Sequence, residues 1–142
     1  MEKQKYQYEV TVNNIEDMEP MDVFNYMHTK FDNVYVPETL TTAEDLQKVS
    51  VLMAWCINVK SYLNTLSVFL DIMTRNAKNA KEKEKHDQLV CKKNIIKSYL
   101  DHINDVYTGT SRVSTIYFKQ QEELMMEGRA NNIQYGGFMR RK

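Results

Sequence analysis

A run of apolar residues between positions 49 and 80 constrains the fold of this chain more than any other feature. Its members are spaced alternately three and four residues apart without interruption: Val49, Leu52, Cys56, Val59, Leu63, Leu66, Leu70, Met73, Ala77 and Ala80. This spacing is the heptad seam of a helix that packs lengthwise against a partner helix. A second row, Trp55, Tyr62 and Phe69, adjoins the seam and makes the apolar face wider than a two-stranded coiled coil requires. We therefore expect this helix to contact more than one neighbour.

The long helix is predicted to begin at about Thr41, because Thr41-Thr42-Ala43-Glu44 has the pattern of a capping box. No glycine or proline occurs between Glu38 and Thr108, so composition alone would permit one uninterrupted helix. The heptad phase changes after residue 80, however, because the continued seam would fall on polar residues such as Glu84. We place a turn within residues 81–86. The alternative is a stutter in a straight helix.

The apolar residues after this turn follow a new helical phase: Leu89, Ile96, Tyr99, Ile103, Val106, Val113 and Tyr117. They predict a second long helix over about residues 87–127, antiparallel to the first. The four residues 108–111 are poor helix formers and predict either a kink or a break that starts a third helix. Gly128 is expected to end the helix, since glycine is the preferred residue just beyond a helix C-terminus.

The N-terminal region predicts one strand and one short helix. Residues 5–12 alternate between apolar and polar, which is typical of a strand with one apolar face. Pro20 follows an acidic run and precedes apolar residues at helical spacing, which predicts a helix over about residues 20–31. Val34 and Val36 flank a brief extended segment, and it is the one candidate within the chain to pair with the first strand.

These elements predict a mainly all-α fold: a long antiparallel helical hairpin or coiled-coil bundle, with a short N-terminal helix and a minor β-strand element. At 142 residues the chain is long enough for one domain with a real core. We expect residues 1–40 to pack with the hairpin of residues 41–127. Residues 128–142 carry four basic residues and no acid, and we expect them to be a basic flexible tail.

Charge is distributed unevenly although the formal net charge is zero. Residues 1–50 carry ten acids and four bases, whereas residues 75–97 carry a net charge of +5. Such a basic cluster at the tip of a hairpin binds phosphates by displacing counterions. The alternative is that these lysines only solvate an exposed tip. The candidate nucleic-acid-binding residues are Arg75, Lys78, Lys81, Lys83, Lys85, Lys92, Lys93 and Lys97.

The sequence contains no pattern that indicates catalysis. None of His28, His86 and His102 has a second histidine or a cysteine three or four residues away, which argues against a metal pair on a helix. Phosphate-binding loops and nucleophile motifs are also absent from the sequence. We expect no catalytic residue, metal or cofactor, and therefore a protein that is not an enzyme.

The cysteines, the N-terminal residues and the uncovered apolar surfaces indicate the cellular compartment and the partners of this protein. Two cysteines without paired spacing and no secretory signal predict a cytoplasmic protein. No apolar run approaches the ~18 residues of a membrane span. The strand of residues 5–12 would leave an open edge, and the second aromatic row would need cover. The candidate oligomer or partner interface is Tyr6, Tyr8, Val10, Val12, Trp55, Tyr62 and Phe69.

The segment Cys91-Lys92-Lys93-Asn94-Ile95-Ile96-Lys97-Ser98-Tyr99-Leu100-Asp101, leading to Ser111-Arg112-Val113 and Phe118-Lys119, resembles small helical proteins of tailed phages, the UvsY-type recombination mediators. The resemblance covers about residues 41–127 and rests on helix order and apolar pattern. It implies an oligomeric, non-enzymatic protein that binds single-stranded DNA and helps to load a recombinase. The basic-aromatic DNA-binding motif of that family is not reproduced here, and residues 78–85 are the nearest substitute.

The sequence therefore predicts a self-associating helical binding protein, a phage-type accessory factor that binds single-stranded nucleic acid through a basic helical tip. It would form a homo-oligomer in the cytoplasm of a host cell. The alternative is a protein–protein interaction module, such as a virion assembly factor or an inhibitor of a host defence complex. That module would use the N-terminal strand edge and the acidic N-terminal face.

Overall fold

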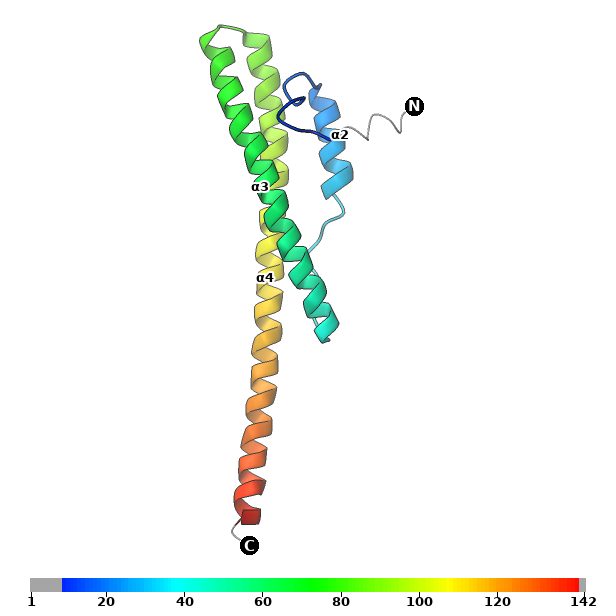
Figure 1. The fold of residues 1–142 in the computed structure, drawn as a ribbon, viewed down its shortest axis with the longest axis vertical. Helices are drawn as coiled ribbons and strands as arrows, with labels where there is room; N and C mark the ends of the chain where they lie inside the picture. The colour runs from blue at the N-terminus through cyan, green and yellow to red at the C-terminus, as the bar shows by residue number, and fades with distance from the viewer. Residues whose placement is uncertain (1–8, 141–142) are drawn as a thin grey trace.

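The computed structural model describes the backbone of residues 9–140 and the side chains of residues 9–128. Three helices follow one another along this part of the chain: α2 (Pro20–Phe31), α3 (Ala43–Asn79) and α4 (Lys83–Arg140). Helices α3 and α4 form an antiparallel hairpin, and α2 lies beside the half of the hairpin that contains the turn (Figure 1). The predicted mainly α-helical fold, with a short helix before two long ones, is confirmed.

The predicted β element is not found in the described residues. Residues 9–12 and 34–36 are irregular in backbone conformation and pair with no strand, and residues 5–8 lie outside the described part of the chain. Instead of continuing as a strand, the backbone turns at residues 11–18. The Asn14 side chain stabilises this turn: its Oδ1 accepts from the Thr11 N–H at 2.8 Å, and its Nδ2 donates to the Glu9 carbonyl at 2.7 Å.

Helix α3 begins with a capping box one residue later than the sequence pattern indicated. Thr42 is the N-cap, and its hydroxyl accepts a hydrogen bond from the Asp45 N–H at 3.1 Å. The Asp45 carboxylate accepts in return from the N–H groups of Thr41 and Thr42, at 3.1 and 3.2 Å. The hydrogen bond from the Thr41 N–H is the largest cause of the lowered pKa of Asp45. Asp45, rather than Glu44, therefore caps the helix.

The hairpin turn is a tight connection of three residues between Asn79 and Lys83, which overlaps the predicted position and rules out a straight helix. The Glu82 N–H donates to the Ala77 carbonyl at 2.9 Å, and the Lys81 N–H donates to the Lys78 carbonyl at 3.1 Å. This pair of bonds is a Schellman motif. Lys81 occupies its left-handed position with φ 59°, where glycine is the usual residue.

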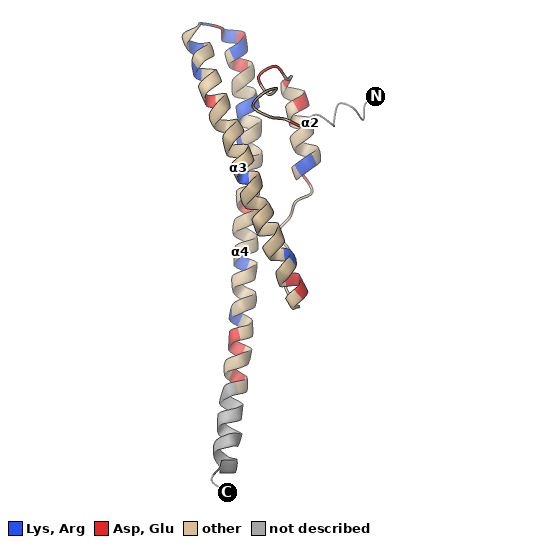
Figure 2. Cartoon of the chain, in the orientation of Figure 1, with Lys and Arg blue, Asp and Glu red and all other residues tan. Residues whose placement is uncertain are grey.

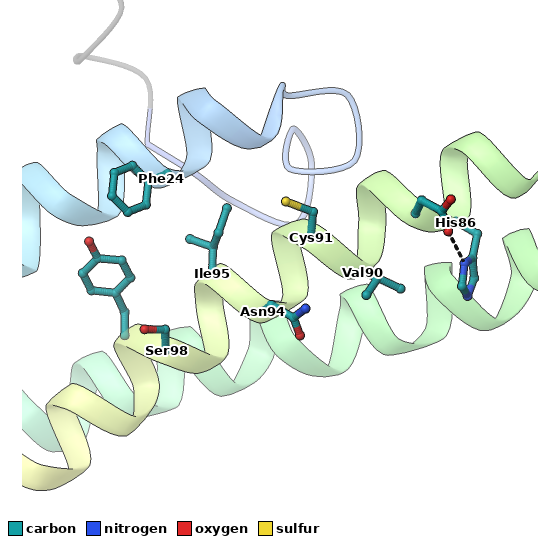
Figure 3. A pocket seen from close by; sticks show the side chains of 9 residues that line it. Phe24, His86, Val90, Cys91, Asn94, Ile95 and Ser98 are labelled. Atoms are coloured by element: carbon teal, nitrogen blue, oxygen red, sulfur yellow. Dashed lines mark hydrogen bonds and ion pairs between the residues drawn. The ribbon is translucent and has the colours of Figure 1, made fainter.

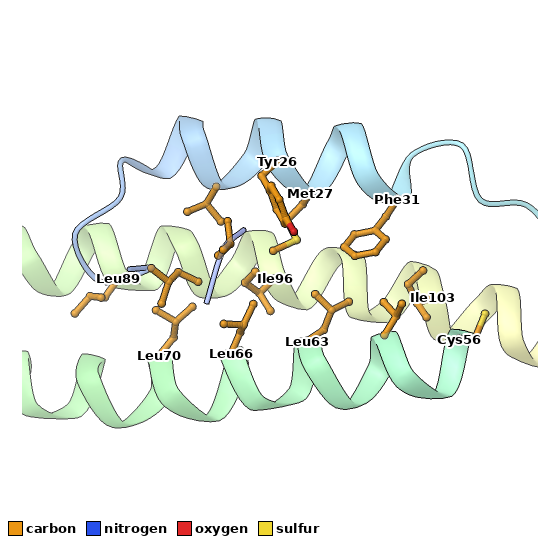
Figure 4. Packing of buried hydrophobic residues seen from close by; sticks show 14 of the residues in the cluster. Tyr26, Met27, Phe31, Cys56, Leu63, Leu66, Leu70, Leu89, Ile96 and Ile103 are labelled. Carbon is orange, nitrogen blue, oxygen red and sulfur yellow. The ribbon is translucent and has the colours of Figure 1, made fainter. Parts of the chain in front are cut away.

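The apolar core lies between the three helices along the predicted seam (Figure 4). From α3 it buries seven of the predicted positions, and from α4 it buries residues of the second phase. Helix α2 adds Val23, Tyr26, Met27 and Phe31. The buried seam residues are Val49, Cys56, Val59, Leu63, Leu66, Leu70 and Ala77 of α3, and Leu89, Ile96, Ile103 and Val106 of α4.

Helix α4 is continuous and longer than predicted. Residues 108–111 lie inside it, so the alternative of a third helix starting there is wrong. Gly128 also lies inside it, and the expected helix end at that residue is wrong, because α4 continues to Arg140. A helical glycine costs only about 1 kcal/mol relative to alanine, which is too little to end a helix by itself. The 58 residues of α4 exceed the 37 of α3, and α4 continues past the start of α3 in Figure 1.

The segment between α2 and α3 crosses the hairpin and is held at two points on α4. The Val34 carbonyl lies 3.0 Å from Nε2 of His102. Further along, Val36 lies so close to Gly109 that a Cβ atom on this glycine would be 2.6 Å from Val36 Cγ2. Gly109 therefore allows the crossing segment to approach the α4 backbone, which a larger residue would prevent.

Candidate anion-binding site

Exposed basic residues gather at the closed end of the hairpin, on the last turns of α3 and the first turns of α4 (Figure 2). Arg75 and Lys78 come from α3, Lys81 from the turn and Lys83 from α4, and all four are exposed. A hollow of about 240 Å³ lies between the two helix ends. Its lining residues are Ala77, Lys78, Lys81, Glu82, Lys83 and His86.

The geometry of the turn brings these cations together. The Schellman motif reverses the chain within three residues, so the lysine before it, the lysine in it and the lysine after it line one hollow. The N-terminus of α4 lies at the same place, and its free N–H groups carry a partial positive charge. The Glu82 carboxylate offsets part of this field. The hollow thus offers three ammonium groups to an anion the size of a phosphate group, and the His86 imidazole that also lines it has its Nδ1 3.2 Å from an Asp87 carboxylate oxygen.

Lys92 is not part of this surface, and its assignment to the nucleic-acid-binding set is wrong. Its side chain is only 1% exposed, and its Nζ donates to the carbonyls of Ile15 at 3.0 Å and Glu16 at 2.7 Å. Burial lowers the pKa of Lys92. These two hydrogen bonds hold the N-terminal turn of residues 11–18 against α4. The burial of Lys92 could have been predicted from the sequence, because Lys92 lies three residues after Leu89 and four before Ile96, on the buried face of α4.

Two further lysines of the predicted set are engaged within the chain. Lys85 Nζ lies 2.9 Å from a Glu16 carboxylate oxygen and 3.9 Å from Glu82. The hydrogen bond to Glu16 is the largest cause of the raised pKa of Lys85. Lys93 forms an ion pair with Asp71 across the hairpin. Glu16 and Asp71 lie far from their lysine partners in sequence, so no local pattern could have identified these two ion pairs.

Lys97 is exposed but stands apart from the tip. It lies 14 residues beyond Lys83 in α4, which corresponds to about 21 Å along the helix. The structure therefore brings together four of the eight predicted cations, Arg75, Lys78, Lys81 and Lys83, and adds His86.

The predicted partner interface is largely occupied inside the chain. Tyr6 and Tyr8 lie outside the described residues, whereas Val10 is fully buried and Val12 is partly buried against the core. The Tyr62 hydroxyl donates to the Val10 carbonyl, and burial raises the pKa of Tyr62. Described residues of the proposed strand therefore present no open edge.

The second aromatic row serves the same internal packing. The Trp55 ring lies 6.0 Å from the Phe31 ring, centroid to centroid, and Phe69 packs against the core. Trp55, Tyr62 and Phe69 are thus partly buried within the chain, with α2 beside Trp55 and the N-terminal segment beside Tyr62. The sequence correctly predicted that α3 contacts more than one neighbour, but the second neighbour belongs to the same chain.

An open groove of about 620 Å³ runs along α4 beside α2 (Figure 3). Phe24, Ile95 and Tyr99 form its apolar end, and His86 and Asp87 form its polar end. The exposed Cys91 thiol lies in the groove, whereas Cys56 is buried in the core, and the two cysteines are not bonded to each other. Among the described residues, no group of three or more histidine, cysteine or acidic side chains is placed to hold a metal ion.

Comparison of the chain with known protein families, curated proteins and solved structures found no match. Within the described part of the chain, none of the helices combines the length and apolar character that crossing a membrane requires.

Proposed function

We propose that this protein is a non-enzymatic binding protein that holds the phosphate backbone of single-stranded nucleic acid at the tip of its helical hairpin. The observation that supports this most is the lysine in the left-handed position of the turn. A non-glycine residue in this conformation costs about 1–2 kcal/mol, which glycine would avoid. Lys81 nevertheless occupies it, beside Lys78 and Lys83. A cation kept at an energetic cost, at the centre of a cationic hollow, favours a role in binding anions.

The surroundings of the hollow favour phosphates over bases as the group that is bound. No phenylalanine, tyrosine or tryptophan side chain lines it, and its one aromatic ring is the His86 imidazole, so base stacking contributes little there. Binding would then depend on charge and counterion release, with little preference for sequence. The tip is the convex end of two helices, about 20 Å across. A flexible single strand can bend over such an end and place several phosphates near Arg75, Lys78, Lys81 and Lys83.

The test is a titration of the full chain against a labelled single-stranded oligonucleotide at a series of salt concentrations. The decisive variant is Lys81→Gly, because it removes one cation while it suits the backbone of the turn. We expect weaker binding and a salt slope reduced by about 0.7, the value for one phosphate contact on a single strand. Lys97→Gly is the matched control, and it should leave the affinity and slope of the folded protein unchanged. Equal effects of the two variants would contradict the proposal, as would no binding at low salt.

A protein-binding module is the second candidate function, and the α2–α4 groove supports it. Phe24 of α2 lines this groove and is 40% exposed, although most apolar residues of α2 face the core. If the oligonucleotide titration shows no binding, the groove becomes the leading surface. Phe24→Ser should then reduce binding of a protein partner, whereas Lys81→Gly should not.

A further inference from the structure

A second heptad row runs along the outside of α3, on the face turned away from the core. Seven residues follow one another at spacings of three and four, and every one of them is exposed. We call this row the outer seam: Val51, Ala54, Asn58, Ser61, Thr65, Val68 and Ile72. Its apolar members are well exposed, with Val51 at 66%, Val68 at 56% and Ile72 at 50%. The row extends over three heptads, about 33 Å of helix.

The outer seam lies on a surface that lacks charge. From Val49 to Leu70 the sequence contains one charged residue, Lys60. Its Nζ lies 5.0 Å from the centroid of the Tyr107 ring, so this cation is directed toward α4 and not outward. Figure 2 shows α3 almost entirely tan between its two ends. Charged residues make up about 25% of an ordinary globular domain and are mostly exposed, and depletion of charge marks the centres of interfaces.

The order of residues along the outer seam is nearly the same in both directions. Apolar residues stand at both ends, and three small polar residues, Asn58, Ser61 and Thr65, stand in the middle. When a second copy of α3 is laid antiparallel with a two-fold axis near Ser61, apolar positions meet apolar positions and polar positions meet polar ones. Val51 then lies opposite Ile72 of the other copy, and Ala54 opposite Val68.

We propose that the outer seam of α3 is a homodimer interface in which a second copy of this chain packs antiparallel across a two-fold axis near Ser61. A two-fold axis places each charge near the axis close to its own symmetry mate. An uncharged face is therefore what self-pairing needs, whereas a different protein would be recognised in part by complementary charges. The 3–4 spacing supplies the knobs and holes of a coiled-coil contact.

This dimer would place the two hairpin tips at opposite ends of the particle. Each Lys81 lies 20 residues from Ser61, about 30 Å along the helix, so the two tips would be about 60 Å apart. Dimerisation does not depend on what the tips bind, and it stands or falls separately from the proposed function.

Sedimentation velocity of the full chain over a range of concentrations gives the first test, with a matched pair of variants. Thr65 and Thr115 are both exposed helical threonines whose hydroxyls donate to the carbonyl four residues earlier at 2.9 Å. Thr65→Glu places an unpaired charge in the outer seam and should raise the dimer dissociation constant at least tenfold, about 1.4 kcal/mol. Thr115→Glu, on α4, should leave it unchanged. A wild-type monomer at high concentration would overturn the proposal, and so would equal effects of the two variants.

Disulfide trapping tests the orientation in a Cys91→Ser background, which removes the exposed native thiol. A mixture of Val51→Cys and Ile72→Cys chains should form a mixed disulfide dimer on oxidation, and neither chain alone should do so. Efficient cross-linking of Val51→Cys with itself would indicate parallel packing and overturn the antiparallel arrangement.

Discussion

The buried ammonium of Lys92 makes a strong prediction about stability. Lys92→Met keeps an unbranched apolar side chain of similar length but removes both hydrogen bonds to the carbonyls of Ile15 and Glu16. A hydrogen bond from a charged donor contributes a net of about 1.5–3 kcal/mol to stability, with the loss of hydration already included. Both bonds share one ammonium group, so we take the contribution of a single such bond as the lower bound. We expect a loss of at least about 2 kcal/mol in the free energy of unfolding.

Urea unfolding followed by circular dichroism measures this loss, and hydrogen exchange locates it. Exchange should accelerate first at the amides of residues 11–18, because Lys92 fastens this turn to α4. Lys97→Met is the control, since Lys97 is an exposed lysine of the same helix, and it should change stability by less than about 0.5 kcal/mol. If Lys92→Met is as stable as the wild type and its turn exchanges no faster, then Lys92 does not fasten the turn.

The pH dependence of the same pair of proteins gives an independent check. Burial lowers the folded-state pKa of Lys92 below its ordinary value of 10.5. Between the folded pKa and 10.5 the unfolded chain binds more protons at this residue than the folded chain does. The contribution of this group to stability therefore rises with pH across that window. The wild type should gain stability relative to Lys92→Met as the pH increases toward 10.5, and a constant difference would refute the assignment of a depressed pKa.

Two further predictions concern the backbone at the turn and at the helix crossing. Lys81→Gly should raise the free energy of unfolding by about 1 kcal/mol because it relieves a left-handed conformation, whereas Lys97→Gly, inside α4, should lower the free energy of unfolding by a similar amount. A lower free energy of unfolding for Lys81→Gly than for the wild type in urea would contradict this. Gly109→Ala should lower the free energy of unfolding by about 1–3 kcal/mol, because the new Cβ atom would clash with Val36. Gly128→Ala should raise the free energy of unfolding by about 0.5–1 kcal/mol, because a Cβ atom there meets nothing within 4 Å. Thermal unfolding should place these two melting temperatures on opposite sides of the wild-type value, and the reverse order would contradict the close approach at Gly109.

The helices were predictable because their signals are local and periodic. Seven of the nine seam positions from Val49 to Ala77 are buried and the other two are partly buried, and the phase change after Ala80 marks the turn. Pro20 stands at the start of α2 where its missing N–H is not needed. In each case, a few neighbouring residues carry both the pattern and the physical reason for it.

The covering of the second face of α3 was not predictable in the same way. An apolar stripe shows that cover is needed, and it does not show which segment supplies it. Val10, whose carbonyl accepts from the Tyr62 hydroxyl, and Phe31, whose ring packs against Trp55, contribute this cover, and the expected strand with an open edge is absent from residues 9–12. The outer seam is not evident from the sequence, because the small polar residues at its centre interrupt the apolar character of its 3–4 spacing.

The sequence predicts where the candidate site lies but not which basic residues belong to it. The reason is the way in which this chain distributes its charge. The acidic N-terminal part folds back on the basic part: Glu16 engages Lys85, and two backbone carbonyls of the same turn engage Lys92. These contacts engage Lys85 and Lys92, Asp71 engages Lys93, and Lys97 lies apart from the tip. The other four cations lie at the hairpin tip, where Lys81 also occupies a left-handed conformation that favours glycine. A chain of zero net charge thereby keeps one cationic end, and an anion that binds there need not compete with the acids that hold the N-terminal turn in place.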